Sequence, residues 1–161
     1  MKRLLLMLCS LLAAIGLPAC DYFAVRDLKP GVSSVAEVRA RLGEPQTVWP
    51  NADGSTTLEY SRQPQGAECY MATIGTDGVL LRLEQVLNEA SFARVEPGMS
   101  EEQVLRLLGR PASRQRFALK QETVWEWLID RGDADAPRYF TVSFGDDGLV
   151  RGSGRYSRPR G

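Results

Sequence analysis

The sequence predicts an α+β protein built from two tandem units, each a helix followed by an antiparallel sheet, with the helices packed on one face of the sheet. Three observations support this fold class. The same landmarks recur in the same order along the chain, helix-capping residues precede an apolar stripe in each repeat, and the apolar period changes from helical to alternating after each helix.

The repeat is visible as paired landmarks at nearly constant spacing. Gly31 and Gly98 are 67 residues apart, and Tyr60 and Trp127 are also 67 residues apart. The Asp-Gly pairs that end the two repeats are 70 residues apart. Recurrence of several landmarks in one order predicts two copies of one supersecondary unit.

Each repeat begins with the signals of a capped helix. Ser100 followed by Gln103 predicts a capping box, in which side chain and backbone bond reciprocally. Gly109 suits the left-handed residue that ends a helix, and Pro111 prevents the helix from resuming. The corresponding residues of the first repeat are Ser34, Glu37, Gly43 and Pro45. One extra residue lies between Gly31 and Gly43, so we expect the first helix to start differently.

After each helix, apolar residues alternate with polar ones, as in strands with one buried face. Trp125, Trp127 and Ile129 share one such face. The Asp-Gly pairs at 77–78 and 147–148 predict tight hairpin turns. Longer hairpin loops are expected over residues 51–54 and 131–137, and short helices over Phe92–Val95 and Phe23–Leu28.

The first twenty residues have the features of a cleavable secretory signal. Lys2 and Arg3 precede an apolar run from Leu4 to Leu17, which is shorter than the ~20 residues of a membrane-spanning helix. The segment Leu17-Pro18-Ala19-Cys20 resembles the lipobox of bacterial lipoproteins, which implies that Cys20 is acylated with fatty acids such as palmitate and becomes the new N-terminus. The alternative is an ordinary signal with a chance cysteine.

The expected organisation follows from the signal and the repeats. It comprises a cleaved signal peptide (1–19), a lipidated N-terminus and linker (20–28), a first unit (29–87), a second unit (88–156) and a basic tail (157–161). The tail region contains the arginines Arg151, Arg155, Arg158 and Arg160. These could contact anionic lipid; the alternative is a solvated, largely disordered end.

Composition narrows the chemistry. The chain has 20 basic and 20 acidic residues, which argues against a nucleic-acid-binding protein. It has no histidine, which removes Ser-His-Asp and Cys-His catalysis and the commonest zinc sites. Cys69 is the one thiol expected to stay free, so no intramolecular disulfide is predicted. We therefore expect no enzyme, no metal site and no cofactor.

The repeat pattern also carries a family resemblance. The residues Gly98, Ser100, Val104, Leu108, Gly109 and Pro111, followed by Trp125-Glu126-Trp127, resemble the pattern of the BamE (SmpA/OmlA) family of envelope lipoproteins. The first copy matches, with one inserted residue, at Gly31, Ser33, Val38, Leu42, Gly43 and Pro45. BamE carries a single unit. The tandem arrangement is similar to the β-lactamase inhibitor protein-like fold.

The resemblance implies a periplasm-facing lipoprotein that acts as a non-catalytic interaction module, accessory to outer-membrane β-barrel assembly or envelope integrity. Its partners would be envelope proteins, including components of the assembly machinery. The alternative is a periplasmic inhibitor or binding module of the tandem β-lactamase inhibitor type. The candidate partner-binding residues are Tyr60, Arg62, Trp125, Trp127 and Tyr139. The competing interpretation places most of the aromatic residues in the core, because each sheet must bury one face under its helix.

The membrane that holds the anchor is left open between two expectations. The family resemblance implies the outer membrane. Asp21, directly after the acylated cysteine, resembles the signal that retains lipoproteins in the inner membrane of enteric bacteria. We favour the outer membrane because the anchor and the repeat unit both match an outer-membrane family.

Overall fold

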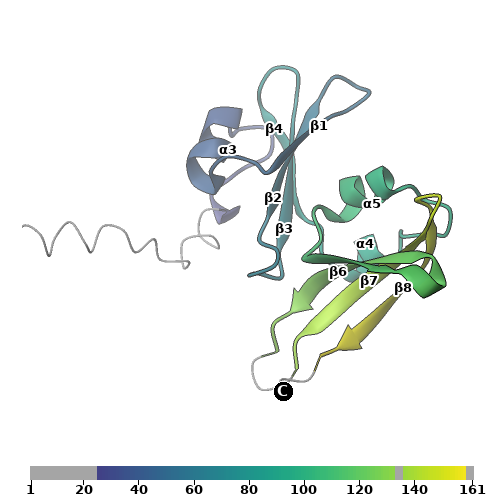
Figure 1. Cartoon of the computed structure of the whole chain (residues 1–161). Helices are drawn as coiled ribbons and strands as arrows, with labels where there is room; N and C mark the ends of the chain where they lie inside the picture. The colour runs from purple at the N-terminus through teal and green to yellow at the C-terminus, as the bar shows by residue number, and fades with distance from the viewer. Residues whose placement is uncertain (1–24, 133–135, 159–161) are drawn as a thin grey trace, which may run out of the picture.

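The computed structural model describes residues 25–132 and 136–158 as two four-stranded antiparallel sheets, ordered β1-β2-β3-β4 and β5-β6-β7-β8, each accompanied by a capped helix (Figure 1). This confirms the predicted α+β class with two helix-plus-sheet units. The lipobox, Cys20 and Asp21 lie outside the described residues. Within the described ranges, no helix combines the length and the apolar character needed to cross a bilayer.

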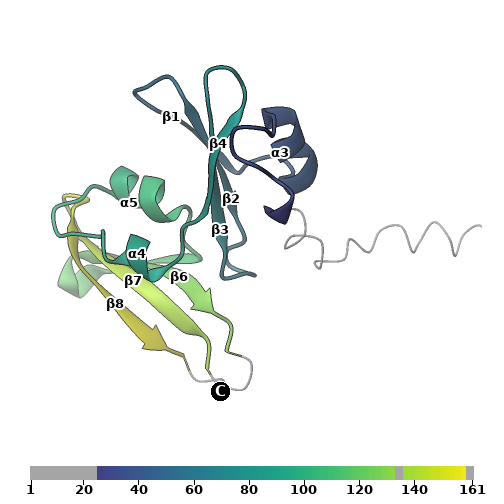
Figure 2. The same ribbon diagram turned by 180° about the vertical axis from the view of Figure 1, so that it is seen from behind.

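The elements follow one another as meanders. The first unit consists of α3 (Val35–Leu42), β1 (Thr47–Pro50), β2 (Thr56–Ser61), β3 (Cys69–Ile74) and β4 (Leu80–Gln85). The second unit consists of α4 (Glu89–Phe92), α5 (Glu101–Leu108), β5 (Ser113–Phe117), the 3-10 turn η2 (Ala118–Lys120), β6 (Glu122–Asp130), β7 (Arg138–Gly145) and β8 (Val150–Ser157). Figures 1 and 2 show α4 and α5 between the two sheets, whereas α3 lies on the other side of the first sheet.

Both predicted capping boxes are confirmed. Ser34 Oγ accepts a hydrogen bond from the Glu37 amide, and the Glu37 carboxylate accepts one from the Ser34 amide. Ser100 and Gln103 make the same reciprocal pair at the start of α5. The first box begins three residues after its glycine and the second begins two residues after, which is the expected difference in how the helices start.

The glycines that end the helices differ from the expected left-handed cap. Gly43 has φ 84° and ψ −163°, and Gly109 has φ 73° and ψ −171°. The positive φ is as predicted, but ψ is extended rather than left-handed helical. This combination is essentially restricted to glycine, because a Cβ atom would collide with the backbone. The chain therefore leaves each helix directly into the extended conformation that leads to the next strand.

Each helix covers one face of its own sheet. In the first unit the buried residues are Leu28, Val38, Leu42, Leu58, Tyr60, Ala72, Ile74 and Leu80. In the second unit they include Val104, Leu107 and Leu108 of α5 with Trp125, Trp127, Phe140, Val142, Phe144 and Val150 of the sheet. Cys69 and Met71 of β3 belong to this second cluster, so the opposite face of the first sheet packs against the second unit.

Two sequence expectations about segment boundaries need correction. The short helix predicted over Phe92–Val95 lies three residues earlier, over Glu89–Phe92, because the Asn88 side chain caps it by accepting from the Ser91 amide. The alternative of a largely disordered basic end is wrong for residues 151–157, which belong to the edge strand β8. Of the other predicted short helix, Phe23–Leu28, the described part is helical at Val25 and Arg26.

Candidate interaction surface

The second sheet presents an uncovered outer face, opposite to the face under α5. Tyr139 of β7 and Tyr156 of β8 are direct cross-strand partners on this face, and their rings stack with centroids 5.3 Å apart. The guanidinium of Arg158 lies 4.8 Å from the Tyr139 ring centroid. Glu126 of β6 lies beside them. We call Glu126, Tyr139, Tyr156 and Arg158 the outer-face cluster.

Glu126 holds this cluster together. Its carboxylate accepts hydrogen bonds from the Tyr156 hydroxyl at 2.6 Å, from Ser113 Oγ at 2.8 Å and from Arg158 Nη2 at 3.1 Å. Burial acts to raise the pKa of Glu126, but these hydrogen bonds outweigh it, and the pKa lies below its ordinary value. Burial, together with the bond to the Glu126 carboxylate, raises the pKa of Tyr156 to about 12.

This lowered pKa predicts an acid-sensitive stability contribution. A carboxyl with a folded pKa below its unfolded value of about 4.3 stabilises the fold above that value and loses the contribution as pH falls through the folded pKa. We expect Glu126→Gln to flatten the loss of unfolding free energy between about pH 5 and pH 3. Urea titrations at several pH values measure this. Glu101→Gln, on the exposed start of α5, is the control and should keep the wild-type slope; an unchanged slope in Glu126→Gln would contradict the prediction.

A loop of the first unit closes one end of the second sheet. The Gln63 side chain donates from Nε2 to the Leu128 carbonyl at 2.7 Å, and its Oε1 accepts from the Leu128 amide at 2.9 Å. The side-chain amide of Gln63 therefore takes the place of a neighbouring strand backbone. It pairs with Leu128 near the end of β6, beyond the residues of β6 that pair with β5. Ser61 Oγ lies 3.5 Å from the Arg110 carbonyl in the same region.

A buried carboxylate joins the two units. Glu59 of β2 is 1% exposed. Its Oε1 accepts from the Arg110 amide at 2.7 Å and its Oε2 accepts from Trp49 Nε1 at 3.1 Å. Because the Arg110 amide follows the end of α5, this bond fixes the second unit against the first sheet. Removal of the carboxylate would leave a buried amide without a partner.

Cys69 is buried in the same contact between the first sheet and the end of α5. It is 0% exposed, and burial raises the pKa of its thiol, with a further contribution from the Glu59 carboxylate. A buried thiol with a raised pKa forms little thiolate and reacts slowly. We expect iodoacetamide to label Cys69 at least ~100-fold more slowly in the native protein than in urea. Mass spectrometry of timed samples measures this, and equal rates in both states would refute the structural assignment.

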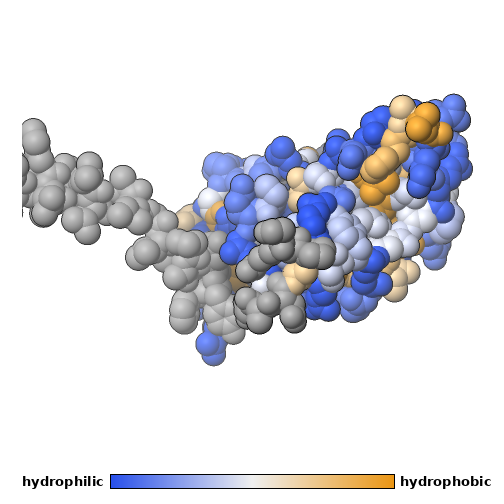
Figure 3. All heavy atoms as spheres, turned by 60° about the horizontal axis from the view of Figure 1, so that its bottom comes forward, coloured by the Kyte–Doolittle hydropathy of each residue, from blue (hydrophilic) through white to orange (hydrophobic). Residues whose placement is uncertain are grey.

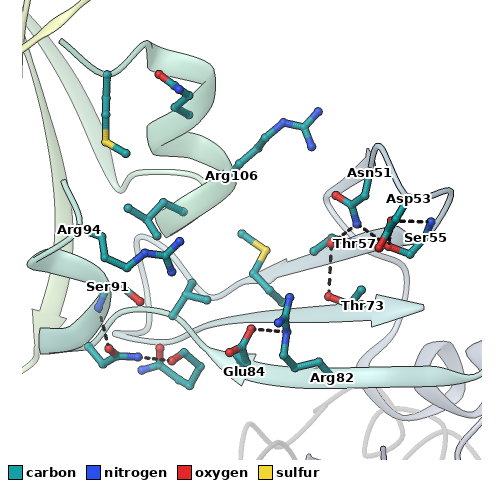
Figure 4. Close-up of a pocket in the computed structure, with 17 residues that line it drawn as sticks. Asn51, Asp53, Ser55, Thr57, Thr73, Arg82, Glu84, Ser91, Arg94 and Arg106 are labelled. Carbon is teal, nitrogen blue, oxygen red and sulfur yellow. Dashed lines mark hydrogen bonds and ion pairs between the residues drawn. The ribbon is translucent and has the colours of Figure 1, made fainter. Parts of the chain in front are cut away.

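A polar cleft of ≈ 470 Å³ separates the first sheet from α4 and α5 (Figure 4). Arg82 and Glu84 of β4 form an ion pair along one wall, and Asp53 accepts from Ser55 at the β1–β2 hairpin. Arg94 and Arg106 project from the opposite wall (Figure 4). Most of these charged groups are already bonded to neighbours: Arg82 to Glu84, Arg106 to Glu102, and Asp53 to Ser55. Residues 25–132 and 136–158 contain no group of three or more metal-ligating side chains.

Hydrophobic side chains are exposed at the connection from β5 to β6. Leu119 of η2 is 103% exposed and Phe117 at the end of β5 is 38% exposed. Figure 3 shows hydrophobic residues gathered at the right-hand end of the molecule, with hydrophilic residues around them.

The structure divides the aromatic residues predicted as partner-binding. Tyr60, Trp125 and Trp127 are 1%, 1% and 0% exposed, so these side chains face the core and no partner can reach them without unfolding. Tyr139 lies on the outer face, and Arg62 lies partly exposed in the loop after β2. The sequence interpretation did not include Glu126 and Tyr156 among the partner-binding residues, and it considered Arg158 only as a tail residue that could contact anionic lipid.

Fold and surface define a small α+β module that offers a polar-aromatic sheet face. A family model described as the outer membrane protein assembly factor BamE domain matches residues 84–154. A solved chain, provisionally described as the osmotically inducible lipoprotein OsmE, is 36% identical; the alignment covers 44% of this chain and 72% of that one, with a TM-score of 0.37. The family model together with this relative shows that the protein belongs to the BamE family, and the matched segment covers its second unit and the end of β4.

More distant similarities span both units. A proposed β-lactamase inhibitor protein from Streptococcus mutans is 14% identical over 86% of this chain and 97% of that chain, with a TM-score of 0.34. A DUF4309 family protein from Bacillus subtilis is 15% identical over 86% and 93% of the two chains, with a TM-score of 0.31. Scores this low add no support to the inhibitor alternative. No curated protein matches the sequence.

Proposed function

We propose that this protein is a periplasm-facing lipoprotein, anchored through Cys20, that binds protein partners during outer-membrane β-barrel assembly. The match of residues 84–154 to the BamE assembly-factor domain carries the proposal. The uncovered outer face of the second sheet, with its cluster of two tyrosines, a carboxylate and an arginine, supports it. Tyrosine and arginine are enriched among the residues that dominate binding energy at protein interfaces.

The first unit has the same order of one capped helix and four strands, but its residues 29–83 lie outside the matched segment. We propose that residues 29–87 form a second BamE-like unit, and that the outer face of its sheet binds the second unit of the same chain instead of a partner. Glu59 and Cys69 of that face are covered by the end of α5, whereas the equivalent face of the second sheet is open. One unit would thus position the other for partner binding.

Capture from native envelopes tests the partner class. The tagged wild-type lipoprotein, solubilised in mild detergent, should retain components of the β-barrel assembly machinery. Tyr139→Ala combined with Arg158→Ala should reduce that recovery at least tenfold, because a hot-spot pair is lost. Leu81→Ala, an exposed hydrophobic position on the first sheet, is the matched control. Recovery of a single soluble enzyme instead would favour the inhibitor alternative.

Fractionation tests the anchor and its membrane. Wild type should sediment with the outer membrane in a density gradient, and Cys20→Ala should become soluble in the periplasm or mislocalised, because two or more acyl chains are needed for stable anchoring. Mass spectrometry should find Cys20 acylated at the new N-terminus. If wild type instead stays in the inner membrane and Asp21→Ser moves it outward, the outer-membrane assignment is wrong.

A further inference from the structure

Among the described residues, β8 (Val150–Ser157) is the longest edge strand, with eight residues. β8 is the last strand of its sheet, so it has a strand neighbour on one side only. At its beginning the edge is covered, because the Val150 amide donates to the Met99 carbonyl at 2.8 Å and the Gly98 amide donates to the Val150 carbonyl at 2.9 Å. In the described chain, no backbone hydrogen bond covers the edge from Ser153 to Ser157.

The register shows which backbone groups face outward. The Arg158 amide donates to the Pro137 carbonyl at 3.0 Å, and Tyr156 and Gly154 are the next hydrogen-bonded positions along the antiparallel ladder with β7. Amide and carbonyl groups of the intervening residues, Ser153, Arg155 and Ser157, therefore point away from the sheet. Their spacing matches an added antiparallel strand.

The other edge strands of the described residues are shorter than β8. β1 has four residues and ends at Pro50. The Leu80 end of β4 is bonded to Gly31 and Ser33, and Gln85 at its other end is engaged by Asn88. β5 has five residues. Proteins block edge pairing with short edge strands and with prolines. β8 has eight residues and contains no proline.

The arginines of β8 determine which kind of strand can pair with its uncovered edge. A second copy of this chain, related by a two-fold axis centred on Arg155 in the middle of the uncovered segment, would set the two Arg155 side chains opposite each other. A two-fold axis centred on Gly154 would place Arg155 of one copy opposite Ser153 of the other, so the two Arg155 side chains would be diagonal neighbours. Like charges across strands destabilise pairing. The ion pairs of Arg151 with Asp147 and of Arg155 with Glu89 are solvent-exposed, with arginine side chains about half exposed, so an incoming carboxylate can exchange for either acid.

We propose that the outer edge of β8, from Ser153 to Ser157, binds an extended, acidic segment of another polypeptide as an additional antiparallel strand. Main-chain hydrogen bonds to the outward groups give affinity, and Arg151 and Arg155 select carboxylates. The further identification of the partner as an unfolded β-barrel precursor rests on the proposed function. Strand addition to the edge does not depend on it.

Amide exchange followed by NMR tests the edge directly. The probe is a soluble decapeptide of alternating threonine and glutamate, added to the whole lipid-free chain. At saturation we expect exchange of the Ser153, Arg155 and Ser157 amides to slow about tenfold or more, whereas the inward amides of Gly154 and Tyr156 are protected already. The same peptide with lysine in place of glutamate should give no protection. No added protection with the acidic peptide would overturn the proposal.

Two variants separate edge pairing from folding. Ser153→Pro removes one outward amide without removing a bond to β7, a position where proline is tolerated, and should lower peptide affinity at least tenfold. Ser153→Ala loses the same hydroxyl but keeps the amide, and should bind as wild type. If Ser153→Pro fails to fold, Arg155→Glu provides the second test, because it should reverse the preference toward the lysine peptide. Unchanged preference in Arg155→Glu would refute the charge selection.

Two further outcomes are decisive. Protection of the same amides that depends on protein concentration, without peptide, would show that a second copy occupies the edge and would overturn the proposal. Slowed exchange with the acidic peptide, but not with a urea-unfolded β-barrel protein diluted into native buffer, would retain the edge site and remove the precursor as its partner. Failure to capture assembly components would count against the proposed function alone.

Discussion

Gly109→Ala is expected to destabilise the protein by about 3 kcal/mol or more, through two independent causes. The residue has φ 73°, which alanine adopts poorly. A Cβ atom there would lie closer than 3.0 Å to Cys69 Sγ, 3.1 Å from Glu59 Oε1 and 3.3 Å from Met71 Cε. These atoms belong to the first sheet, so the clash would separate the two units at their junction.

Gly43→Ala is the matched control. Gly43 ends the equivalent helix with φ 84°, but nothing lies within 4 Å of the Cβ position. Only backbone strain remains, which costs about 1–3 kcal/mol. Equilibrium urea unfolding of both variants measures the difference. Iodoacetamide labelling of Cys69 reports the junction itself and should accelerate in Gly109→Ala but not in Gly43→Ala. Equal destabilisation and equal labelling would show that the units are not packed as described.

Trp127→Ala is expected to cost about 3–5 kcal/mol of unfolding free energy, the usual range for a large aromatic residue removed from a core. The side chain is 0% exposed and packs near Trp125 and Phe140. Its Nε1 donates to the Gly109 carbonyl at 3.0 Å, so the variant also leaves a carbonyl at the end of α5 without this partner. Thermal and urea unfolding should both show the loss.

Tyr139→Ala provides the contrast on the same sheet. Tyr139 stacks on Tyr156 on the outer face and contributes a cross-strand pair, worth about 0.2–1 kcal/mol. We expect a small change in stability together with loss of partner capture, the opposite of the pattern for Trp127→Ala. If Trp127→Ala folded with normal stability but no longer captured the partner, Trp127 would be a partner-binding residue, which would contradict its assignment to the core.

The family resemblance, the helix caps and the strand alternation could be predicted from the sequence because each depends on residues close together in the chain. A capping box joins residues three apart, as in Ser100 and Gln103, and a strand reveals its buried face by alternation, as in Trp125 and Trp127. Burial of those tryptophans was the competing interpretation, since a sheet under a helix must bury one face; the prediction that they bind a partner was wrong. Alternation alone could not say which face a partner would meet.

The candidate surface was less accessible to sequence reasoning. Tyr139 and Tyr156 lie 17 residues apart, and their stacking depends on the register between β7 and β8. That register includes an irregularity between Ser143 and Phe144, so counting back from the turn does not predict which residues are opposite. The basic end looked disordered because a strand rich in glycine and arginine has low intrinsic strand propensity; pairing with β7 overrides it.

The sequence by itself therefore determined two helix-plus-sheet units, their caps, their turns and the positive φ of Gly43 and Gly109. Only the tertiary structure decided that the outer face of the first sheet is closed and that of the second sheet is open. The physical reason lies at the end of α5. Glu59 can be buried because the Arg110 amide and the Trp49 indole satisfy its carboxylate, and Gly109 lets the backbone approach Cys69 where a side chain would clash. Contacts between residues about fifty positions apart leave no periodic trace in a single sequence, whereas caps and alternation do.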